Sequence, residues 1–262
     1  MGGFGFCHLS LVPVRKEPAH SSELVTQLLF GEVFSYGKNE GNFVAIKNAG
    51  DDYIGWLHHK QYLSISKNSF EKLKNPKNFF VSAEMQSAMK DVNENIIFPI
   101  PAGSRIPKGR AGRFVLEGHS FQYYGEASGK IPLKEIRKKI ITTALQFLRT
   151  PYLWGGKSEM GIDCSGFTQV VYSINGIFLP RDAYQQAELG NTRDFVEQSL
   201  PGDLAFFNNE NGKITHVGIV LENQKIIHAS GMVRIDDLDL KGIKTVNTEN
   251  YSHFLRSINN II

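Results

Sequence analysis

The apolar residues of this 262-residue chain follow a helical period only near residues 134–174, and a strand-like pattern on both sides of that stretch. Before it, short apolar segments are repeatedly interrupted by Gly, Pro, Asn or Asp, which is typical of small β-barrels. After it, the segments again have the length and composition of strands. Helices followed by an antiparallel sheet predict an α+β domain at the C-terminal end, preceded by all-β modules.

The N-terminal half predicts two small barrels. Residues 1–66 contain five strand-like segments, and residues 67–130 repeat the rhythm in a degenerate form, for example in NIIFPIPAGSRIP and RFVLEGHSFQYYGEA. A linker is expected in SGKIPL, at 128–133. The predicted domains are therefore 1–66, 67–130 and 131–262.

Composition excludes some classes of protein. Hydrophobic residues make up 41% and charged residues 21%, as in ordinary globular proteins. A net charge of +3 gives no case for nucleic-acid binding, and no apolar run is long enough to span a membrane. The opening MGGFGFCHLS lacks the features of a secretory signal. We therefore expect a cytoplasmic protein or, if a signal was removed, a periplasmic or cell-envelope one.

Of the two cysteines, which we expect to be free thiols, Cys164 stands at the start of the helical pattern in GIDCSGFTQVVYSING. A helix N-terminus carries unpaired N–H groups and partial positive charge, so we expect the pKa of a thiol there to fall. Asp163 is suited to cap this helix, and Ser165 leaves room for a substrate; both residues are predicted to belong to the substrate-binding site. The alternative is a buried structural cysteine, the commoner role of a lone cysteine.

A cysteine nucleophile needs a base, and the base needs an orienting partner. His216 and His228 lie in neighbouring candidate strands, THVGIVL and KIIHAS. If residues 222–224 form a three-residue loop, His228 pairs with Gly218 and both imidazoles lie on one face of the hairpin. A two-residue loop would place them on opposite faces. The same residues with Cys164 lack a fourth ligand at a spacing typical of zinc sites, so no metal is predicted.

These segments together resemble the NlpC-type family of papain-like bacterial cell-wall peptidases. PYLWGG, GIDCSGF, LPRDA, PGDLAFF, HVGIVL and IIHAS occur in the family's order across about residues 135–240. The segments VPVRKEP, SSELVTQLLFGE and DDYIGWL resemble the bacterial SH3-like domain of the γ-D-glutamyl-L-diamino-acid endopeptidase branch. The resemblance implies a circularly permuted papain-like catalytic domain preceded by two SH3-like barrels.

The resemblance also implies roles for individual residues. Cys164 would be the nucleophile, His216 the base and His228 the partner that orients His216, with backbone N–H groups at the helix start holding the oxyanion. Trp154 aligns with an aromatic wall of the family's cleft, and Asp182 with an acidic residue that holds the free amine of the substrate. Ala183 follows Asp182 where this branch often has serine, so one hydroxyl contact is missing.

The first barrel is expected, on the same resemblance, to limit how much substrate precedes the scissile bond. Glu17 would then join Asp182 near the α-ammonium of the substrate's L-Ala, and the Tyr53 hydroxyl would hydrogen-bond the substrate or the oxyanion. The predicted substrate is a murein peptide, L-Ala-γ-D-Glu-diamino acid with a free N-terminus, and no cofactor or nucleic acid is expected. Without the resemblance, Glu17 and Asp182 read as solvated charges, Tyr53 as a barrel aromatic and Trp154 as core filling.

Two other functions stay open from the sequence. One is another papain-like activity, such as an amidase or acyltransferase; the other is a wall-binding module with an inactive peptidase domain. The leading prediction is a peptidase that acts in turnover or recycling of the cell wall, with a monomer favoured. The sequence does not distinguish lysine from diaminopimelate as the diamino acid.

Overall fold

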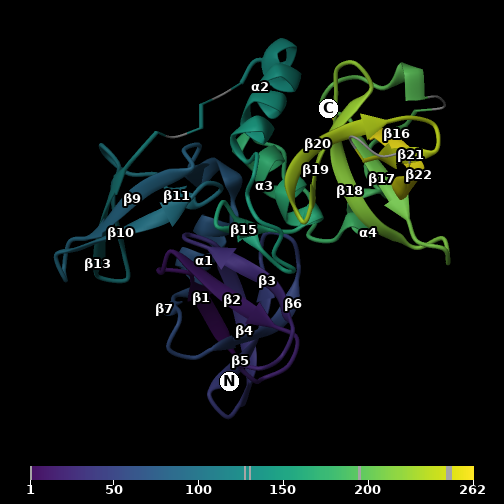
Figure 1. Ribbon diagram of the computed structural model, residues 1–262. Helices are drawn as coiled ribbons and strands as arrows, with labels where there is room; N and C mark the ends of the chain where they lie inside the picture. Colours follow the sequence, from purple (N-terminus) through teal and green to yellow (C-terminus); the bar gives the residue numbers. More distant parts are fainter. Residues whose placement is uncertain (1, 127, 130, 194–195, 246–249) are drawn as a thin grey trace. The chain divides into compact units, whose positions relative to one another are not determined.

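The computed structural model describes residues 2–126, 128–129, 131–193, 196–245 and 250–262. The chain divides into two compact units (Figure 1). The N-terminal unit comprises residues 1–129 and the short segment 154–158. The C-terminal unit comprises residues 130–153 and 159–262.

A seven-stranded antiparallel sheet forms the first part of the N-terminal unit, in the order β3-β2-β6-β5-β4-β1-β7. The five strands expected from the sequence are confirmed, and the sequence pattern missed the short strands β1 and β7. The strands are β1 (Gly3–Phe6), β2 (Leu11–Arg15), β3 (Leu24–Leu29), β4 (Val33–Glu40), β5 (Phe43–Asn48), β6 (Ile54–His58) and β7 (Leu63–Ile65).

The second part of this unit holds a four-stranded sheet, β10-β9-β13-β12, and a two-stranded sheet, β11-β8. A helix that the sequence analysis missed, α1, precedes them; Ser66 caps it by accepting a hydrogen bond from the Ser69 N–H at 3.2 Å. The elements are α1 (Lys67–Lys74), η1 (Pro76–Asn78), β8 (Phe79–Val81), β9 (Gln86–Asp91), β10 (Ile96–Pro101), β11 (Arg105–Pro107), β12 (Arg113–Leu116) and β13 (His119–Tyr124).

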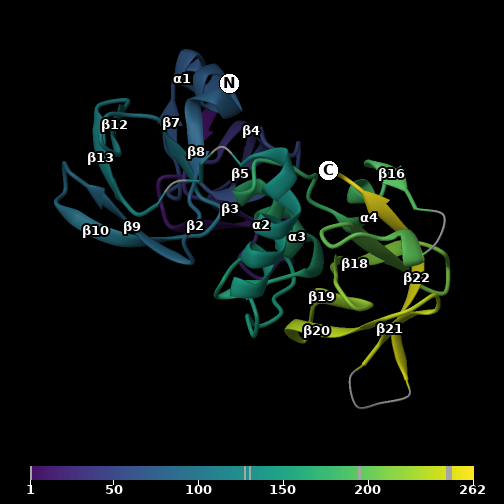
Figure 2. The same ribbon diagram turned by 90° about the horizontal axis from the view of Figure 1, so that it is seen from above.

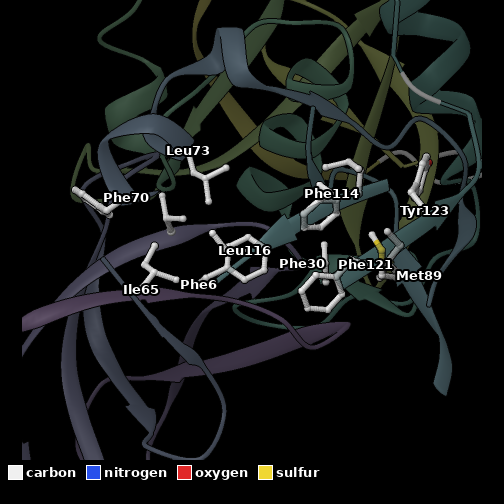
Figure 3. Packing of buried hydrophobic residues seen from close by; sticks show 13 residues of the cluster. Phe6, Phe30, Ile65, Phe70, Leu73, Met89, Phe114, Leu116, Phe121 and Tyr123 are labelled. Atoms are coloured by element: carbon white, nitrogen blue, oxygen red, sulfur yellow. The ribbon is translucent and has the colours of Figure 1, made fainter. Parts of the chain in front are cut away.

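The two parts of the N-terminal unit share a hydrophobic core. Figure 3 shows Phe6, Phe30 and Ile65 of the first part in one cluster with Phe114 and Phe121 of the second. The rings of Phe30 and Phe121 lie 5.8 Å apart in an edge-on arrangement. A separate cluster fills the first sheet: Cys7, Val12, Val14, Leu28, Phe34, Val44, Ile46 and Leu57. The first part therefore has a core of its own and shares a second core with the other part.

The segment 154–158, which contains β14 (Lys157–Ser158), is held in the N-terminal unit by polar contacts. The Trp154 indole donates to Glu23 at 2.8 Å, and the Lys157 ammonium lies 3.2 Å from the buried carboxylate of Glu32. Burial alone would raise the pKa of Glu32, but Lys157 and Arg105 outweigh it and hold that pKa below its ordinary value. The segment is thus attached by a buried ion pair.

The C-terminal unit is an α+β domain, as the change of period predicts. Six strands pair in the order β22-β17-β18-β19-β20-β21, and β21 also pairs with β22, so these six strands close into a barrel. The strands are β15 (Gly161–Ile162), β16 (Asn191–Thr192), β17 (Leu204–Asn208), β18 (Ile214–Leu221), β19 (Lys225–Ser230), β20 (Met232–Leu238), β21 (Gly242–Lys244) and β22 (Tyr251–Asn260). The sequence analysis did not foresee the closure.

The helices of this unit are α2 (Leu133–Gln146), α3 (Cys164–Ile174) and α4 (Ala183–Gln186), with the short turn η2 (Val196–Gln198). Helix α3 packs against β18 and β19 (Figures 1 and 2). Ten of its eleven residues are buried, more than the single apolar face expected from the sequence. Among the described residues, no helix has the length and hydropathy to cross a membrane.

Candidate active site

Cys164 is the first residue of α3, as the sequence predicts. The Asp163 carboxylate caps the helix by accepting a hydrogen bond from the Gly166 N–H at 2.7 Å. The Cys164 thiol lies 3.9 Å from the Thr215 carbonyl and accepts from the Val217 N–H. The backbone on either side of His216 therefore contacts the thiol, while β18 pairs with β19 from Gly218 onward.

The hairpin that carries the two histidines has the predicted register. Gly218 pairs with His228, and residues 222–224 form the three-residue loop. A Cβ at Gly218 would stand 2.9 Å from the Cβ of His228, which is closer than two carbon atoms can approach. Glycine therefore leaves the space across which the His228 ring reaches toward His216.

Three buried side chains form a hydrogen-bonded row on the inner face of the barrel. His216 Nε2 lies 2.9 Å from His228 Nδ1, and His228 Nε2 lies 3.0 Å from Asp236 Oδ2. His216 is 5% exposed, and His228 and Asp236 are each 1% exposed. Burial at this level means that the hydrogen bonds compete with little water. The sequence analysis paired the histidines but missed Asp236.

Two further side chains complete this row. Arg234 forms an ion pair with Asp236, with its Nε 2.7 Å from Oδ2. The ring of His253, on β22, stacks on that of His216 with centroids 4.0 Å apart. The only sequence signal for Asp236 was a carboxylate in the otherwise strand-like VRIDDL, and for His253 a histidine in the strand-like YSHFL.

Burial determines the protonation of the nucleophile and the base. It lowers the pKa of His216 well below its ordinary value, with His228 and His253 adding to the effect, so this imidazole is neutral near pH 7. Burial, followed by the charge of Asp163, raises the pKa of the Cys164 thiol to about 12. The expectation of a lowered thiol pKa is wrong, because desolvation outweighs the helix terminus. The ground state is a neutral thiol beside a neutral imidazole.

This protonation state predicts how Cys164 reacts with iodoacetamide. Because the thiol pKa is raised, the thiolate fraction is small at pH 7 and grows tenfold with each pH unit. We expect the alkylation rate to rise steadily from pH 7 to pH 10, measured by peptide mass spectrometry. Cys7, fully buried and also raised in pKa, is the internal control and should react more slowly. A rate that is flat across this range would indicate a thiolate–imidazolium pair instead.

A buried arginine supports the start of α3. Arg181 is 1% exposed and forms an ion pair with Asp163. It also donates to the Ser165 hydroxyl at 3.0 Å. The Asp163 and Ser165 side chains, predicted to contact substrate, are thus committed to the helix start. The pairing of Arg181 with Asp163 was not predicted from the sequence, although Arg181 stands beside the predicted Asp182 in LPRDA.

Arg181→Met is expected to lower the free energy of unfolding by about 3–5 kcal/mol, because it leaves the buried Asp163 charge without its partner. Urea denaturation followed by circular dichroism measures this. Lys225→Met is the matched control, since Lys225 and Asp237 form an ion pair with both side chains more than 40% exposed and such pairs contribute about 0–1 kcal/mol. Equal losses in both variants would contradict a special role for the buried pair.

Asp182 is the N-cap residue of α4 in the C-terminal unit, and its N–H donates to the Gln185 side chain at 3.1 Å. The buried Gln186 of the same helix bonds to Thr168 Oγ1 at 2.6 Å, which ties α4 to α3. Asp182 is only half-buried. The LPRDA segment is therefore anchored to the nucleophile's helix on one side while Asp182 remains accessible.

Glu17, Tyr53 and Trp154 all lie in the N-terminal unit. Glu17 is exposed in the loop between β2 and β3, Tyr53 is half-buried before β6, and Trp154 is 59% exposed. Trp154 is not core filling, because its indole is bonded to Glu23 at the end of the loop that carries Glu17. A role of these three residues toward substrate stays a prediction.

The cluster of His216, His228 and His253 has ring nitrogens within 4.8 Å of one another. Both nitrogens of His228 already take part in hydrogen bonds, to His216 and to Asp236. A metal ion on His228 would have to break one of them. The donor set therefore fits a hydrogen-bonded row better than a metal centre.

A thiol at a helix start beside an oriented imidazole is the arrangement of a cysteine hydrolase. Residues 149–252 match the NlpC/P60 family, and residues 14–61 match the bacterial dipeptidyl-peptidase SH3 domain. The chain therefore carries an NlpC/P60 peptidase domain together with a bacterial SH3 domain.

Relatives share this combination across most of the chain. A γ-D-glutamyl-L-lysine dipeptidyl-peptidase of Bacillus subtilis is 29% identical over 219 residues, which cover 78% of this chain and 71% of the relative. A protein of the same name from Bacillus cereus is 27% identical, covering 80% and 68%. The crystal structure of an NlpC/P60 family protein from Bacillus cereus matches with a TM-score of 0.80 at 20% identity, covering 98% and 99%. That likeness confirms the predicted papain-like and SH3-like architecture.

Proposed function

We propose that this protein is a cysteine endopeptidase that hydrolyses the γ-D-Glu–diamino acid bond of peptidoglycan stem peptides with a free N-terminal L-Ala. The observation that carries the proposal is the Cys164 thiol at the helix start, which contacts the backbone on either side of His216, together with the hydrogen bond from His216 to His228. It supplies a nucleophile, a neutral base and a partner that orients the base. The names of the two Bacillus relatives support the choice of bond.

In the first step, His216 takes the thiol proton as Cys164 Sγ bonds to the γ-carbonyl carbon of D-Glu. Since thiol and imidazole are both neutral beforehand, proton transfer accompanies the attack. The carbonyl oxygen becomes an oxyanion. The first N–H groups of a helix have no intrahelical acceptor, so the Cys164 N–H at the start of α3 is a donor for this oxyanion.

In the second step, the tetrahedral intermediate collapses and the C–N bond breaks. The His216 imidazolium gives its proton to the leaving amine of the diamino acid, and a thioester remains on Cys164. Water then attacks the thioester while His216 takes a proton from it, and the thiol is restored. His228 keeps the His216 ring in one orientation throughout.

For the substrate's amino end, we propose that Asp182 pairs with the L-Ala ammonium, since its half-buried carboxylate stands on a helix anchored to α3. Glu17 and Tyr53 are predicted to contribute to recognition of the same peptide, and Trp154 to line the cleft. Each is a target for substitution, with kcat/KM as the measurement.

Mass spectrometry of defined muropeptides tests the proposed function. Incubation with L-Ala-γ-D-Glu-L-Lys and with the meso-diaminopimelate peptide should release L-Ala-D-Glu and the free diamino acid from at least one. The ratio of the two rates identifies the preferred diamino acid. An amidase or acyltransferase would leave the γ-bond intact and would contradict the proposal, as would an inactive wall-binding protein that retains both peptides unchanged.

We further propose that the protein acts as a monomer on soluble wall fragments in the cytoplasm, in keeping with recycling. The free-amine specificity proposed above is consistent with this role, since peptides with a free N-terminal L-Ala are already detached from the glycan. Light scattering of the purified protein and fractionation of cells test the two statements. A dimer, or recovery in the cell-wall fraction, would contradict them.

A further inference from the structure

We propose that Asp236 is a positioning residue that determines, through two imidazole rings, which nitrogen of His216 is free to take the Cys164 proton. The inference rests on the proposed peptidase reaction and gives a role in it to the carboxylate at the end of the row. Three features carry it: the strand register, the burial of the carboxylate, and the order of donors and acceptors along the row.

The register of β19 and β20 places Asp236 beside His228. His228 pairs with Arg234, and Ile226 pairs with Asp236. Directly paired residues on antiparallel strands share a face, so Asp236 is a diagonal neighbour of His228 on the inner face of the barrel. The next residue, Asp237, points to the opposite face and is exposed in an ion pair with Lys225.

The Asp236 carboxylate is buried but has charged and polar partners. The Arg234 guanidinium donates a hydrogen bond from Nη2 to Oδ1 at 2.9 Å, and its Nε lies 2.7 Å from Oδ2 as an ion-pair contact without a hydrogen bond. Oδ2 also lies 3.0 Å from His228 Nε2. A buried carboxylate is costly unless it is paired in this way. Arg234 therefore keeps it as an acceptor, since a guanidinium has donors only.

The direction of every hydrogen bond follows from that acceptor. A carboxylate cannot donate, so in the uncharged form of the His228 ring the proton lies on Nε2. Nδ1 of His228 is then an acceptor, and His216 Nε2 must donate to it. His216 is neutral, so its Nδ1 carries the lone pair. Nδ1 is thus the nitrogen that takes the thiol proton.

The same arrangement stabilises the protonated base. When His216 takes the proton from Cys164, its Nε2–H continues to donate to His228 Nδ1, and no other proton has to move. The new positive charge lies in the barrel interior, where the negative charge of Asp236 offsets it across one ring. Asp236 therefore acts on the reaction without touching the substrate.

Asp236→Asn tests the proposal because it keeps the shape but supplies a donor. Arg234 Nη2 donates to the Oδ1 position, so the amide oxygen takes that place and the NH₂ group faces His228. His228 Nε2 must then accept, its Nδ1–H donates to His216, and His216 presents Nδ1–H to the thiol. We expect kcat to fall by about 10²–10⁴-fold, as when a triad tautomer is reversed. Asp237→Asn is the matched control and should keep the wild-type kcat.

Two readouts separate this role from simple loss of structure. The residual rate of Asp236→Asn should increase about tenfold per pH unit, because the thiolate must form without its base, whereas the wild-type rate does not. In ¹⁵N NMR spectra, His216 and His228 of the wild-type protein should both carry the proton on Nε2. In Asp236→Asn both should carry it on Nδ1.

A double variant tests whether Asp236 acts through His228. Glutamine at position 228 can accept from His216 through its own oxygen, so His228→Gln with Asp236→Asn should be no slower than the slower single variant. A wild-type rate for Asp236→Asn, an additive loss in the double variant, or wild-type protein with Nδ1–H tautomers would overturn the proposal. The NMR result is independent of activity, so a wild-type protein that cleaves no muropeptide would overturn the proposed function alone.

Discussion

Cys164→Ala is expected to abolish hydrolysis, with kcat reduced by about 10⁴-fold or more, while the protein stays folded. The nucleophile has no substitute among its neighbours, because the facing groups are the backbone of Thr215 and Val217. Alanine is a good helix former and removes only a sulfur atom from the start of α3. Release of the diamino acid, followed by mass spectrometry, measures the rate, and circular dichroism checks the fold.

His216→Ala should cost a comparable factor, and the double variant should be no slower than either single one, because the two residues act as a unit. Cys7→Ala is the control: Cys7 lies in the core of the N-terminal unit and should be dispensable for turnover. Substantial turnover by folded Cys164→Ala or His216→Ala would rule out the proposed cysteine-peptidase mechanism.

The sequence predicts the reacting side chains because their positions depend on local rules. Asp163 before Cys164 predicts a capped helix start, and the structure places the start there. The pairing of His228 with Gly218 depends only on the length of one loop and the two-residue period of a strand. The motif was sufficient to predict the helix start, and the spacing was sufficient to predict the pairing of the two strands.

The rest of the site depends on burial, which a local pattern does not report. The thiol pKa was predicted with the wrong sign because the helix terminus is visible in the sequence, whereas the desolvation of Cys164 is a property of the whole unit. Arg181 and Asp236 look like surface charges in LPRDA and VRIDDL. Both are nearly fully buried: Arg181 bonds to Asp163, eighteen residues away in the chain, and Asp236 bonds to His228, eight residues away.

The same limit applies to the fold of the N-terminal unit. The strands of the first sheet follow from local composition and turn residues. The shared core does not follow from local composition, because Phe30 contacts Phe114 and Phe121, which are far from it in the sequence and belong to the other sheet. Helix α1 was missed because Phe70 and Leu73 are too few to produce a helical period in a short polar segment.

N-acetylation of the substrate is expected to reduce kcat/KM by hundreds-fold or more with the wild-type protein. The proposed recognition pairs the L-Ala ammonium with Asp182, and loss of one partner from a desolvated ion pair costs about 3–5 kcal/mol. Asp182→Asn should reduce kcat/KM for the free peptide by a similar factor. Asparagine is as good an N-cap as aspartate, so α4 should remain intact.

The two changes should not be additive. If Asp182 acts on the ammonium, Asp182→Asn should cleave free and acetylated peptides at nearly the same low rate, because the charge that distinguished them is gone. Glu17→Gln and Tyr53→Phe, measured in the same way, show whether these residues recognise the same group. Efficient cleavage of the acetylated peptide by the wild-type protein would contradict the free-amine specificity and, with it, the proposed role in recycling. If Asp182→Asn still prefers the free peptide as strongly as the wild-type protein does, another acidic residue binds the ammonium. Glu17 would then be the next residue to substitute.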